Sequence, residues 1–394
     1  MIKSIRNSYN SEFTVEKYEK FVKSLNDEFG INIEFRVSET PFFIDKDLKA
    51  KVNLAISNIT SQIKSETFLS KIDKAVPENL KVPNEVPYAD VLSLDFAICK
   101  DESGEFIPKL IELQGFASLY FYQVLLDQKF REFFNIPENC RSLFDGIDYD
   151  EYFKILNDVI IGGADPENVI LLEIEPEKQK TFIDFLCTEK YIGIQSVCIS
   201  DIVKQGNKLY YQKSGKLTPI ERIYNRVIFD ELLKRPDIKY DFKFQDDLDV
   251  RFVAHPNWFF KISKYALPFL SGVYVPETKF LHQVTEIPND LENYILKPLF
   301  SFAGSGVKYD IILDELKAIT DKENYILQKK VNYEPLIQTP DIPAKAELRI
   351  LMVYFNGDYI PLNNLVRLSK GKMMGVDFNK DKSWVGSSIA YFET

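Results

Sequence analysis

Histidine and cysteine, the side chains of most transition-metal sites and of many nucleophilic active sites, are scarce in this chain. Only two histidines, His255 and His282, occur among 394 residues. A Cys/His zinc site or a Ser-His-Asp triad would therefore depend on one of two residues. The four cysteines include no C-x-x-C pair and are too few for a disulfide framework, so structural thiols are expected. If a metal is bound, oxygen ligands and Mg²⁺ are favoured.

Long apolar runs and an excess of positive charge are also absent. No hydrophobic run approaches the length of a membrane span, and the first residues are too polar for a signal peptide. The 49 basic residues against 59 acidic ones leave a net charge of −10, which offers no global field for nucleic acid or anionic lipid. We therefore expect a cytoplasmic protein without a nucleic-acid or membrane partner, although this composition is compatible with a local basic pocket.

Hydrophobic residues make up 45% of the chain, enough for a core in each of two or three compact units at roughly 150 residues per unit. No internal repeat or low-complexity segment is present. Apolar residues recur at threes and fours over residues 15–29 and 48–72, which predicts helices there. We expect a helical N-terminal region over residues 1–85.

Period-two alternation begins the second expected region, residues 86–148. It predicts strands over residues 91–98 and 109–114, joined by a turn at Ser103-Gly104. An aromatic-rich, helix-like run then covers residues 118–134.

The third expected region, residues 149–270, alternates strand, helix and strand, which is typical of a small parallel α/β unit. These elements are predicted over residues 168–174, 178–190 and 194–200. No G-x-G-x-x-G lies between strand and helix, so the unit is not predicted to bind a dinucleotide. The fourth region, residues 271–394, ends in two long strands joined by Asn356-Gly357, the strongest hairpin signal in the sequence.

The first candidate site is YILKPLFSFAGSGV, residues 294–307. A strand containing Lys297 leads into a loop whose small residues would let backbone N–H groups approach a phosphate. The lysine adds a positive charge for the same phosphate. The loop is not a Walker A motif, because no G-K-[ST] follows, and an ordinary turn is the alternative reading.

The second candidate site is the early hairpin. A two-residue turn at Ser103-Gly104 would place Asp95 directly opposite Glu112, with Gln114 on the same face. Two carboxylates opposite one another repel unless a cation neutralises them, so the three oxygen-bearing side chains predict a divalent-metal site. A solvated face with a shifted register is the alternative.

The third candidate site is the late hairpin. Glu347 and Arg349 share a face, and a two-residue Asn356-Gly357 loop would set Asn364 opposite Arg349. Arg367 follows near the end of the second strand. Arginines beside a lysine and a glycine loop are suited to the charge of a transferred phosphoryl group, although an exposed cross-strand set would show the same pattern.

Together these motifs resemble a known family. YILKPLFSFAGSGV, then YILQKKV, ELR and NNLVRL, resemble the nucleotide-binding half of the ATP-grasp superfamily. In that superfamily an acidic segment usually follows the arginine strand. Here the sequence that resembles this segment lies near the N-terminus and reads LSLDFAICKDESGEFIPKLIELQGFASLY. That order is similar to circularly permuted ATP-grasp enzymes related to glutathionylspermidine synthase. The resemblance implies an α/β (α+β) class: a permuted ATP-grasp fold plus a small Rossmann-like pre-ATP-grasp α/β domain over residues 149–270.

The resemblance also implies the roles of individual residues. Phosphate contacts would come from Lys297 and from the loop residues Ser301, Ala303, Gly304, Ser305 and Gly306. The adenine hinge would be Gln328, Lys329, Lys330 and Val331. Glu347 would lie near ribose or metal, and Mg²⁺ would be held by Asp95, Glu112 and Gln114. Arg349 and Arg367 would stabilise the transferred phosphoryl group, and Arg226 would contact an acid substrate. Asn379 would belong to a late loop on the substrate side.

Two positions depart from the family pattern. Gln114 stands where asparagine is usual, and the second phosphate lysine is not placed, with Lys264 and Lys279 as the options. The expected function is an ATP-dependent carboxylate-amine ligase that forms an amide through an acyl-phosphate, with a small acid and an amine as partners. A kinase-like phosphoryl transferase and a nucleotide-binding module without turnover are the alternatives. The identities of the acid and the amine, the oligomeric state and the role of the N-terminal region stay open.

Overall fold

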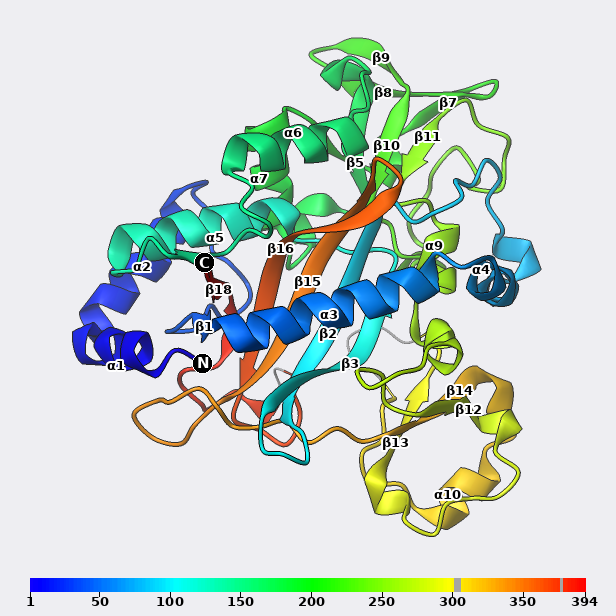
Figure 1. The fold of residues 1–394 in the computed structure, drawn as a ribbon. Coiled ribbons are helices and arrows are strands. Elements are labelled where there is room, and N and C mark those ends of the chain that lie inside the picture. The colour runs from blue at the N-terminus through cyan, green and yellow to red at the C-terminus, as the bar shows by residue number, and fades with distance from the viewer. Residues whose placement is uncertain (301–305, 376–377) are drawn as a thin grey trace.

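The computed structural model describes residues 1–300, 306–375 and 378–394. A five-stranded sheet occupies the centre of the molecule, and its strand order is β17-β16-β15-β2-β3 (Figure 1). Its strands are β2 (Val91–Lys100), β3 (Phe106–Gln114), β15 (Lys345–Phe355), β16 (Asp358–Ser369) and β17 (Gly386–Ser388). Antiparallel pairing joins β2 to β15, so the early and late hairpins, more than 200 residues apart in sequence, form one sheet.

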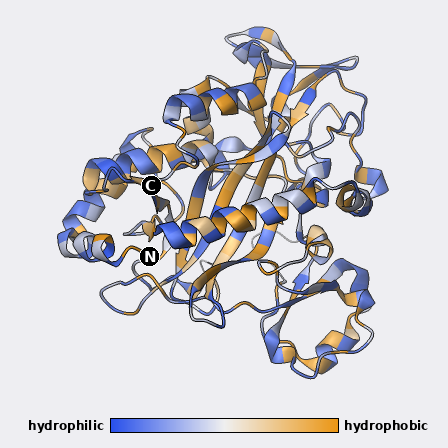
Figure 2. Cartoon of the chain, in the orientation of Figure 1, coloured by the Kyte–Doolittle hydropathy of each residue, from blue (hydrophilic) through white to orange (hydrophobic). Residues whose placement is uncertain are grey.

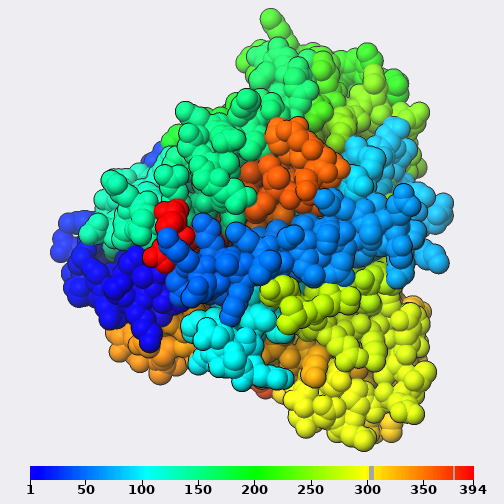
Figure 3. Space-filling view, in the orientation of Figure 1, coloured from blue at the N-terminus to red at the C-terminus, as the bar shows by residue number. Residues whose placement is uncertain are grey.

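The helix α3 (Lys46–Ile63) crosses one face of the central sheet, as Figure 1 shows. Residues at even positions of β2 and β15, such as Leu94, Phe96 and Ile350, pack with Val52 and Ile59 of α3 in one apolar core. Side chains alternate between the two faces of a strand, so the odd positions point away from α3. Hydrophobic residues accordingly run along the central strands in Figure 2, and α3 covers much of this face in the space-filling view (Figure 3).

Helices are present where the sequence periodicity predicts them near the N-terminus, with one difference. The helices are α1 (Lys3–Glu12), α2 (Val15–Asp27), α3 and α4 (Glu66–Ile72). The sequence predicted one helix over residues 48–72, whereas the structure breaks it between Ile63 and Glu66. The Ser65 hydroxyl accepts a hydrogen bond from the Phe68 N–H and so caps a new helix.

A second sheet confirms the predicted parallel α/β unit. Its order is β11-β10-β5-β6, and all three strand pairs are parallel. The strands are β5 (Val169–Glu173), β6 (Gln195–Cys198), β10 (Arg222–Asn225) and β11 (Arg251–Val253), with α5 (Tyr120–Phe133), α6 (Tyr149–Ile160), α7 (Phe182–Ile192), α8 (Phe229–Leu233) and α9 (Asn257–Lys261) around them.

A small lobe carries the strand with Lys297 (Figure 1, lower right). It contains β12 (Thr278–Phe280), β13 (Tyr294–Pro298), β14 (Tyr325–Lys329) and the helix α10 (Leu313–Ala318), with sheet order β12-β14-β13. Two further three-stranded sheets are peripheral. One is formed by β1 (Phe42–Ile44), β18 (Ala390–Glu393) and β4 (Cys140–Arg141), and the other by β7 (Val203–Gln205), β8 (Lys208–Lys213) and β9 (Lys216–Ile220). Among the described residues, no helix is both long and apolar enough to cross a bilayer.

The early hairpin has the predicted Asp95–Glu112 pairing but not the predicted turn. Lys100 pairs with Phe106, so a five-residue loop replaces the two-residue turn. The Asp101 carboxylate organises this loop by accepting hydrogen bonds from the N–H groups of Ser103 and Glu105. A bulge between Asp95 and Phe96 then shifts the register by one residue and restores the pairing of Asp95 with Glu112.

In the late hairpin, the predicted partner of Arg349 is wrong. The Asn356-Gly357 turn forms as expected, with φ values of 50° and 88°, both in the left-handed region that this turn requires. Beyond Pro361 the register shifts by one residue, so Arg349 lies opposite Leu365 and Asn364 lies opposite Ile350. Proline has no N–H for the ladder, which accounts for a bulge at this place.

Gly115, directly after β3, permits a close approach of α9. Its N–H donates to the Ile262 carbonyl oxygen at 2.8 Å. A Cβ at this position would lie 2.7 Å from the Trp258 carbonyl oxygen and 2.8 Å from Ile262 Cβ. The segment that follows α9 is therefore fixed against the end of β3.

We expect Gly115→Ala to destabilise the protein by about 1–3 kcal/mol, because the backbone of α9 must move to admit the methyl group. The midpoint of urea unfolding measures this loss. Gly375→Ala is the matched control, since among the described residues its Cβ would meet nothing closer than Phe378 Cδ2 at 3.8 Å. Equal midpoints for the two variants would contradict the close packing at Gly115.

Candidate active site

The face of the central sheet turned away from α3 carries a grid of charged side chains. Glu112 on β3 lies opposite Asp95 on β2, and Asp95 lies opposite Arg349 on β15. Two positions along β15, Glu347 lies opposite Arg367 on β16. Period-two alternation thus places three carboxylates and two guanidinium groups on adjacent strands of one face.

Ion pairs connect these side chains. Asp95 is fully buried and forms a bidentate pair with Arg349, with Nε 2.7 Å from Oδ1 and Nη2 2.6 Å from Oδ2. Arg367 Nη2 lies 3.5 Å from Asp95 Oδ2. Parallel hydrogen bonds between a guanidinium and a carboxylate are among the strongest polar contacts in proteins, so the Arg349 fork fixes Asp95.

The buried carboxylate of Glu347 has two partners of different kinds. Arg367 donates to Glu347 Oε1 in a close ion pair, and the Tyr333 hydroxyl donates to Oε2 at 3.0 Å. The Arg367 side chain is 41% exposed, so this side of the cluster is accessible to a ligand. Tyr333 was not identified from the sequence, which contains no motif that marks it.

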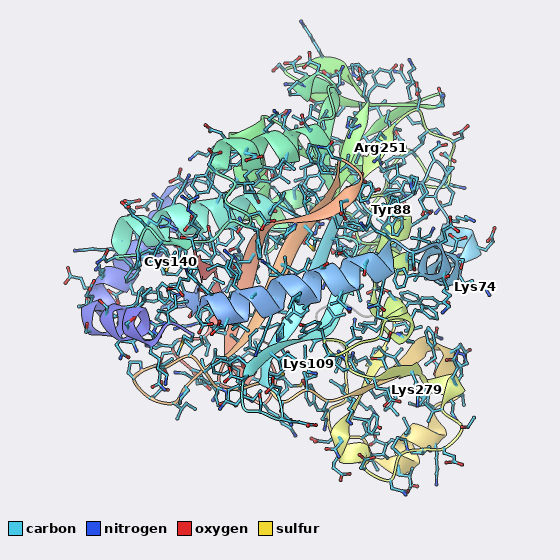
Figure 4. The ribbon with its side chains drawn as sticks, viewed as in Figure 1. Lys74, Tyr88, Lys109, Cys140, Arg251 and Lys279 are labelled. Atoms are coloured by element: carbon cyan, nitrogen blue, oxygen red, sulfur yellow. The ribbon has the colours of Figure 1, made fainter. Side chains whose placement is uncertain are left out.

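Two lysines reach the same cluster from other elements. Lys264, at the start of a 3₁₀ turn (Lys264–Phe269) after α9, places Nζ 3.2 Å from Glu112 Oε1. Lys297 on β13 donates to the Ile111 carbonyl oxygen at 2.9 Å. Lys279 instead lies in the small lobe beside Glu277, as Figure 4 places it (Figure 4). Of the two options for a second lysine, the structure therefore brings Lys264 to the site.

Burial and the neighbouring charges shift the pKa values of the side chains in this cluster. Burial lowers the pKa of Lys297 to about 8. Burial alone would raise the pKa of Glu112, but the positive charges of Lys264, Lys297 and the two arginines outweigh it and lower this pKa. Burial raises the pKa of Glu347, and the negative charge of Asp95 acts in the same direction. Four basic groups thus surround three carboxyl groups, which favours a ligand of negative charge.

The predicted phosphate loop is described only in part. Ser301, Ala303, Gly304 and Ser305 lie outside the described residues. Gly306 has φ +73°, and a Cβ there would lie 3.1 Å from Pro298 Cγ, so this position favours glycine.

The predicted hinge leads from the small lobe to the central sheet. Gln328 is buried in β14, where its side-chain amide donates to Thr278 Oγ1 at 3.1 Å. The N–H groups of Lys329 and Lys330 donate to carbonyl oxygens of the small lobe. Val331 packs beside Ala97 and Cys99 of β2. The segment therefore lies between the sheet of the small lobe and the central sheet, and the side chain of Gln328 is held within the small lobe.

Arg226 is held by the backbone rather than by the charged cluster. It follows β10 and donates through Nη1 to the carbonyl oxygens of Phe116 and Ala117, at 3.2 and 3.0 Å. Its guanidinium also lies 4.7 Å from the centroid of the Phe116 ring. These contacts fix the segment that follows Gln114. Gln114 itself lies two residues beyond Glu112 on β3, opposite Ser93.

Asn379 organises the loop after β16. Its side-chain oxygen accepts from Ser369 Oγ and from the N–H groups of Lys370 and Gly371, at 3.0–3.1 Å. Its amide nitrogen donates to the carbonyl oxygens of Met373 and Gly375. The amide group of Asn379 thus links residues 369–371, Met373 and Gly375 of the segment that follows Arg367.

Comparisons with known proteins identify the fold but no family. No protein-family model matches the chain, and no curated protein matches it. Among solved structures, it is similar to a glutathione synthetase-like effector from Globodera pallida in its apo form, with TM-score 0.60 and 10% sequence identity. The likeness covers 97% of this chain and 98% of that one. It shows a mixed α/β fold of the glutathione synthetase-like type.

The cluster predicts pH-dependent binding of polyphosphate anions. Above pH 8, Lys297 loses its positive charge, because its pKa is about 8. We expect inorganic triphosphate to bind about tenfold more weakly to the wild type than to Lys297→Arg at pH 9.5, since one buried ion pair is lost. Calorimetry at pH 7 and 9.5 measures both constants. The anion titrates in the same way in both experiments, so its own pH dependence cancels in the ratio of the two dissociation constants, wild type over Lys297→Arg. A ratio that is the same at pH 7 and pH 9.5 would contradict the role of Lys297.

Proposed function

We propose that the protein is an ATP-dependent carboxylate-amine ligase. One observation carries this proposal: four basic side chains and three carboxylates converge on one face of a sheet in a glutathione synthetase-like fold. Such a set suits a polyphosphate with its divalent counter-ion. The likeness to the effector supports the fold alone, so the reaction rests on the chemistry of these side chains.

The basic residues would bind the phosphates. Lys264 and Lys297 reach the cluster from the segment after α9 and from β13, while Arg349 and Arg367 belong to the central sheet. The loop containing Gly306 would cover the phosphates, and residues 328–331 would lie at the adenine. Positioning of this kind, with stabilisation of the transferred charge, is the main part of phosphoryl-transfer catalysis.

The oxygen donors of Asp95, Glu112 and Gln114 fit the preference of Mg²⁺ for hard ligands. As the side chains lie, no group of three His, Cys, Asp or Glu residues among the described ones is arranged to hold a metal ion. Asp95 is engaged by Arg349. We propose that these three residues hold Mg²⁺ once the arginines contact phosphate. Bound Mg²⁺ would neutralise charge on the phosphate oxygens.

In the proposed reaction, a carboxylate of the acid substrate attacks the γ-phosphorus of ATP and ADP leaves. The amine then attacks the acyl carbon, phosphate departs, and the amine nitrogen loses a proton. Arg349 and Arg367 would stabilise the transferred phosphoryl group, and no protein nucleophile is required. This agrees with a chain in which the four cysteines are structural candidates and only two histidines occur.

We also propose a permuted order for the ATP-grasp part. The N-terminal strands β2 and β3 complete the sheet beside β15, as that order requires. The likeness to the effector supports the glutathione synthetase-like fold without distinguishing permuted types.

A nucleotide-binding module without turnover is the second candidate. The pairing of Asp95 with Arg349 favours it, because a permanently paired carboxylate would not hold a metal. ADP release that requires both an acid and an amine indicates the ligase. ADP release with acid alone indicates a kinase-like enzyme, and nucleotide binding without ADP release indicates the module.

We expect Glu112→Gln to reduce ADP release on the order of 100-fold, because the amide removes one anionic oxygen ligand and the ion pair between Glu112 and Lys264. A coupled assay for ADP, with a screen of amino acids, peptides and polyamines as substrates, measures this. Glu105→Gln, an exposed change in the loop of the same hairpin, is the matched control. Full turnover in Glu112→Gln would exclude the metal assignment.

A further inference from the structure

Each carboxylate of the cluster is matched with its own basic side chain. Asp95 pairs with Arg349, Glu112 with Lys264, and Glu347 with Arg367. The fourth base, Lys297, donates to a backbone carbonyl oxygen. Every carboxylate of the cluster is therefore paired, and a ligand must exchange these pairs to bind.

The exchange is unfavourable for either ligand component alone. A divalent cation that takes Asp95 would leave the buried Arg349 guanidinium beside it without a carboxylate. A polyphosphate that takes Arg349 would leave the fully buried Asp95 without a cation. When both arrive together, the carboxylates pair with the metal and the bases pair with the phosphates, so every charge keeps an opposite partner.

We propose, on the basis of the proposed function, that divalent metal and polyphosphate bind with positive coupling through this exchange of ion pairs. Arg349 is the positioning residue that enforces the coupling, because its fork occupies both oxygens of Asp95 and withholds them from a metal until phosphate draws the arginine away. By linkage, each component raises the affinity of the other by the same factor.

Arg349 rather than Arg367 has this role for a structural reason. Its side chain is 13% exposed and lies directly opposite Asp95 in the strand register. Arg367 is 41% exposed and reaches Asp95 with one nitrogen at 3.5 Å. Removal of Arg349 therefore removes the two short contacts of Asp95 and leaves the 3.5 Å contact with Arg367.

The test measures the binding of Mn²⁺ alone, without nucleotide, by electron paramagnetic resonance at pH 8. We expect Arg349→Gln to bind Mn²⁺ at least tenfold more tightly than the wild type. This gain is not a result that partial unfolding would produce. Arg235→Gln, which removes an arginine paired with Glu175 and Asp237 in another part of the chain, should leave the affinity unchanged.

The double variant Asp95→Asn, Arg349→Gln locates the gained site, because it should lose the gain. Equal Mn²⁺ affinity in the wild type and Arg349→Gln would overturn the proposal, and so would a gain that survives Asp95→Asn. If Arg349→Gln does not fold, Arg349→Lys decides the question, because a lysine keeps the positive charge but cannot hold both oxygens of Asp95, so this variant must also gain Mn²⁺ affinity. No gain in that variant would overturn the proposal.

Failure of the coupling differs from failure of the proposed function. If Arg349→Gln gains no Mn²⁺ affinity while the wild type releases ADP with an acid and an amine, the coupling is wrong and the ligase stands. If the gain is present but no substrate pair yields ADP, the coupled site stands and the ligase is wrong.

Discussion

The bidentate ion pair between Arg349 and Asp95 is the interaction on which the candidate site depends. It joins β2 to β15 across the face of the central sheet that α3 leaves uncovered. A carboxylate as buried as Asp95 requires an opposite charge, since desolvation of an unpaired ion would cost several kcal/mol. Burial is the largest cause of the raised pKa of the neighbouring Glu347, and the pair also acts on it, because the charge of Asp95 raises this pKa and that of Arg349 lowers it.

The architecture places this pair where three parts of the chain meet. The small lobe contributes Lys297, the segment after α9 contributes Lys264, and the central sheet contributes the carboxylates and arginines. Gly115 allows α9 to approach the end of β3, which keeps Lys264 near Glu112. The site is therefore a consequence of tertiary packing as much as of strand alternation.

The sequence predicted the elements better than their pairing. The Asn356-Gly357 turn, the parallel α/β unit and the opposition of Asp95 to Glu112 could be predicted, because turn chemistry and period-two patterns are local. The partner of Arg349 could not be predicted, since a bulge beyond Pro361 shifts the register. The Asp95–Glu112 pairing was correct although the turn was not, because a five-residue loop and a bulge compensate one another.

Long-range contacts also explain the other differences. Nothing in the local sequence distinguishes Lys264 from Lys279, and only the packing of α9 against β3 brings one of them to Glu112. Arg226 was assigned to substrate by resemblance, whereas its Nη1 donates to the backbone of residues 116 and 117. The pairing of Asp95 with an arginine from a strand about 250 residues away could likewise not be predicted from the motif that contains Asp95.

A crystal structure with Mg²⁺ and a non-hydrolysable ATP analogue tests the central claim most directly. The account predicts that the phosphates lie between Lys264, Lys297, Arg349 and Arg367, that the metal contacts Asp95 and Glu112, and that the bidentate Arg349–Asp95 pair is opened. A nucleotide bound elsewhere, or bound here with that pair intact and no metal at Asp95, would contradict the account.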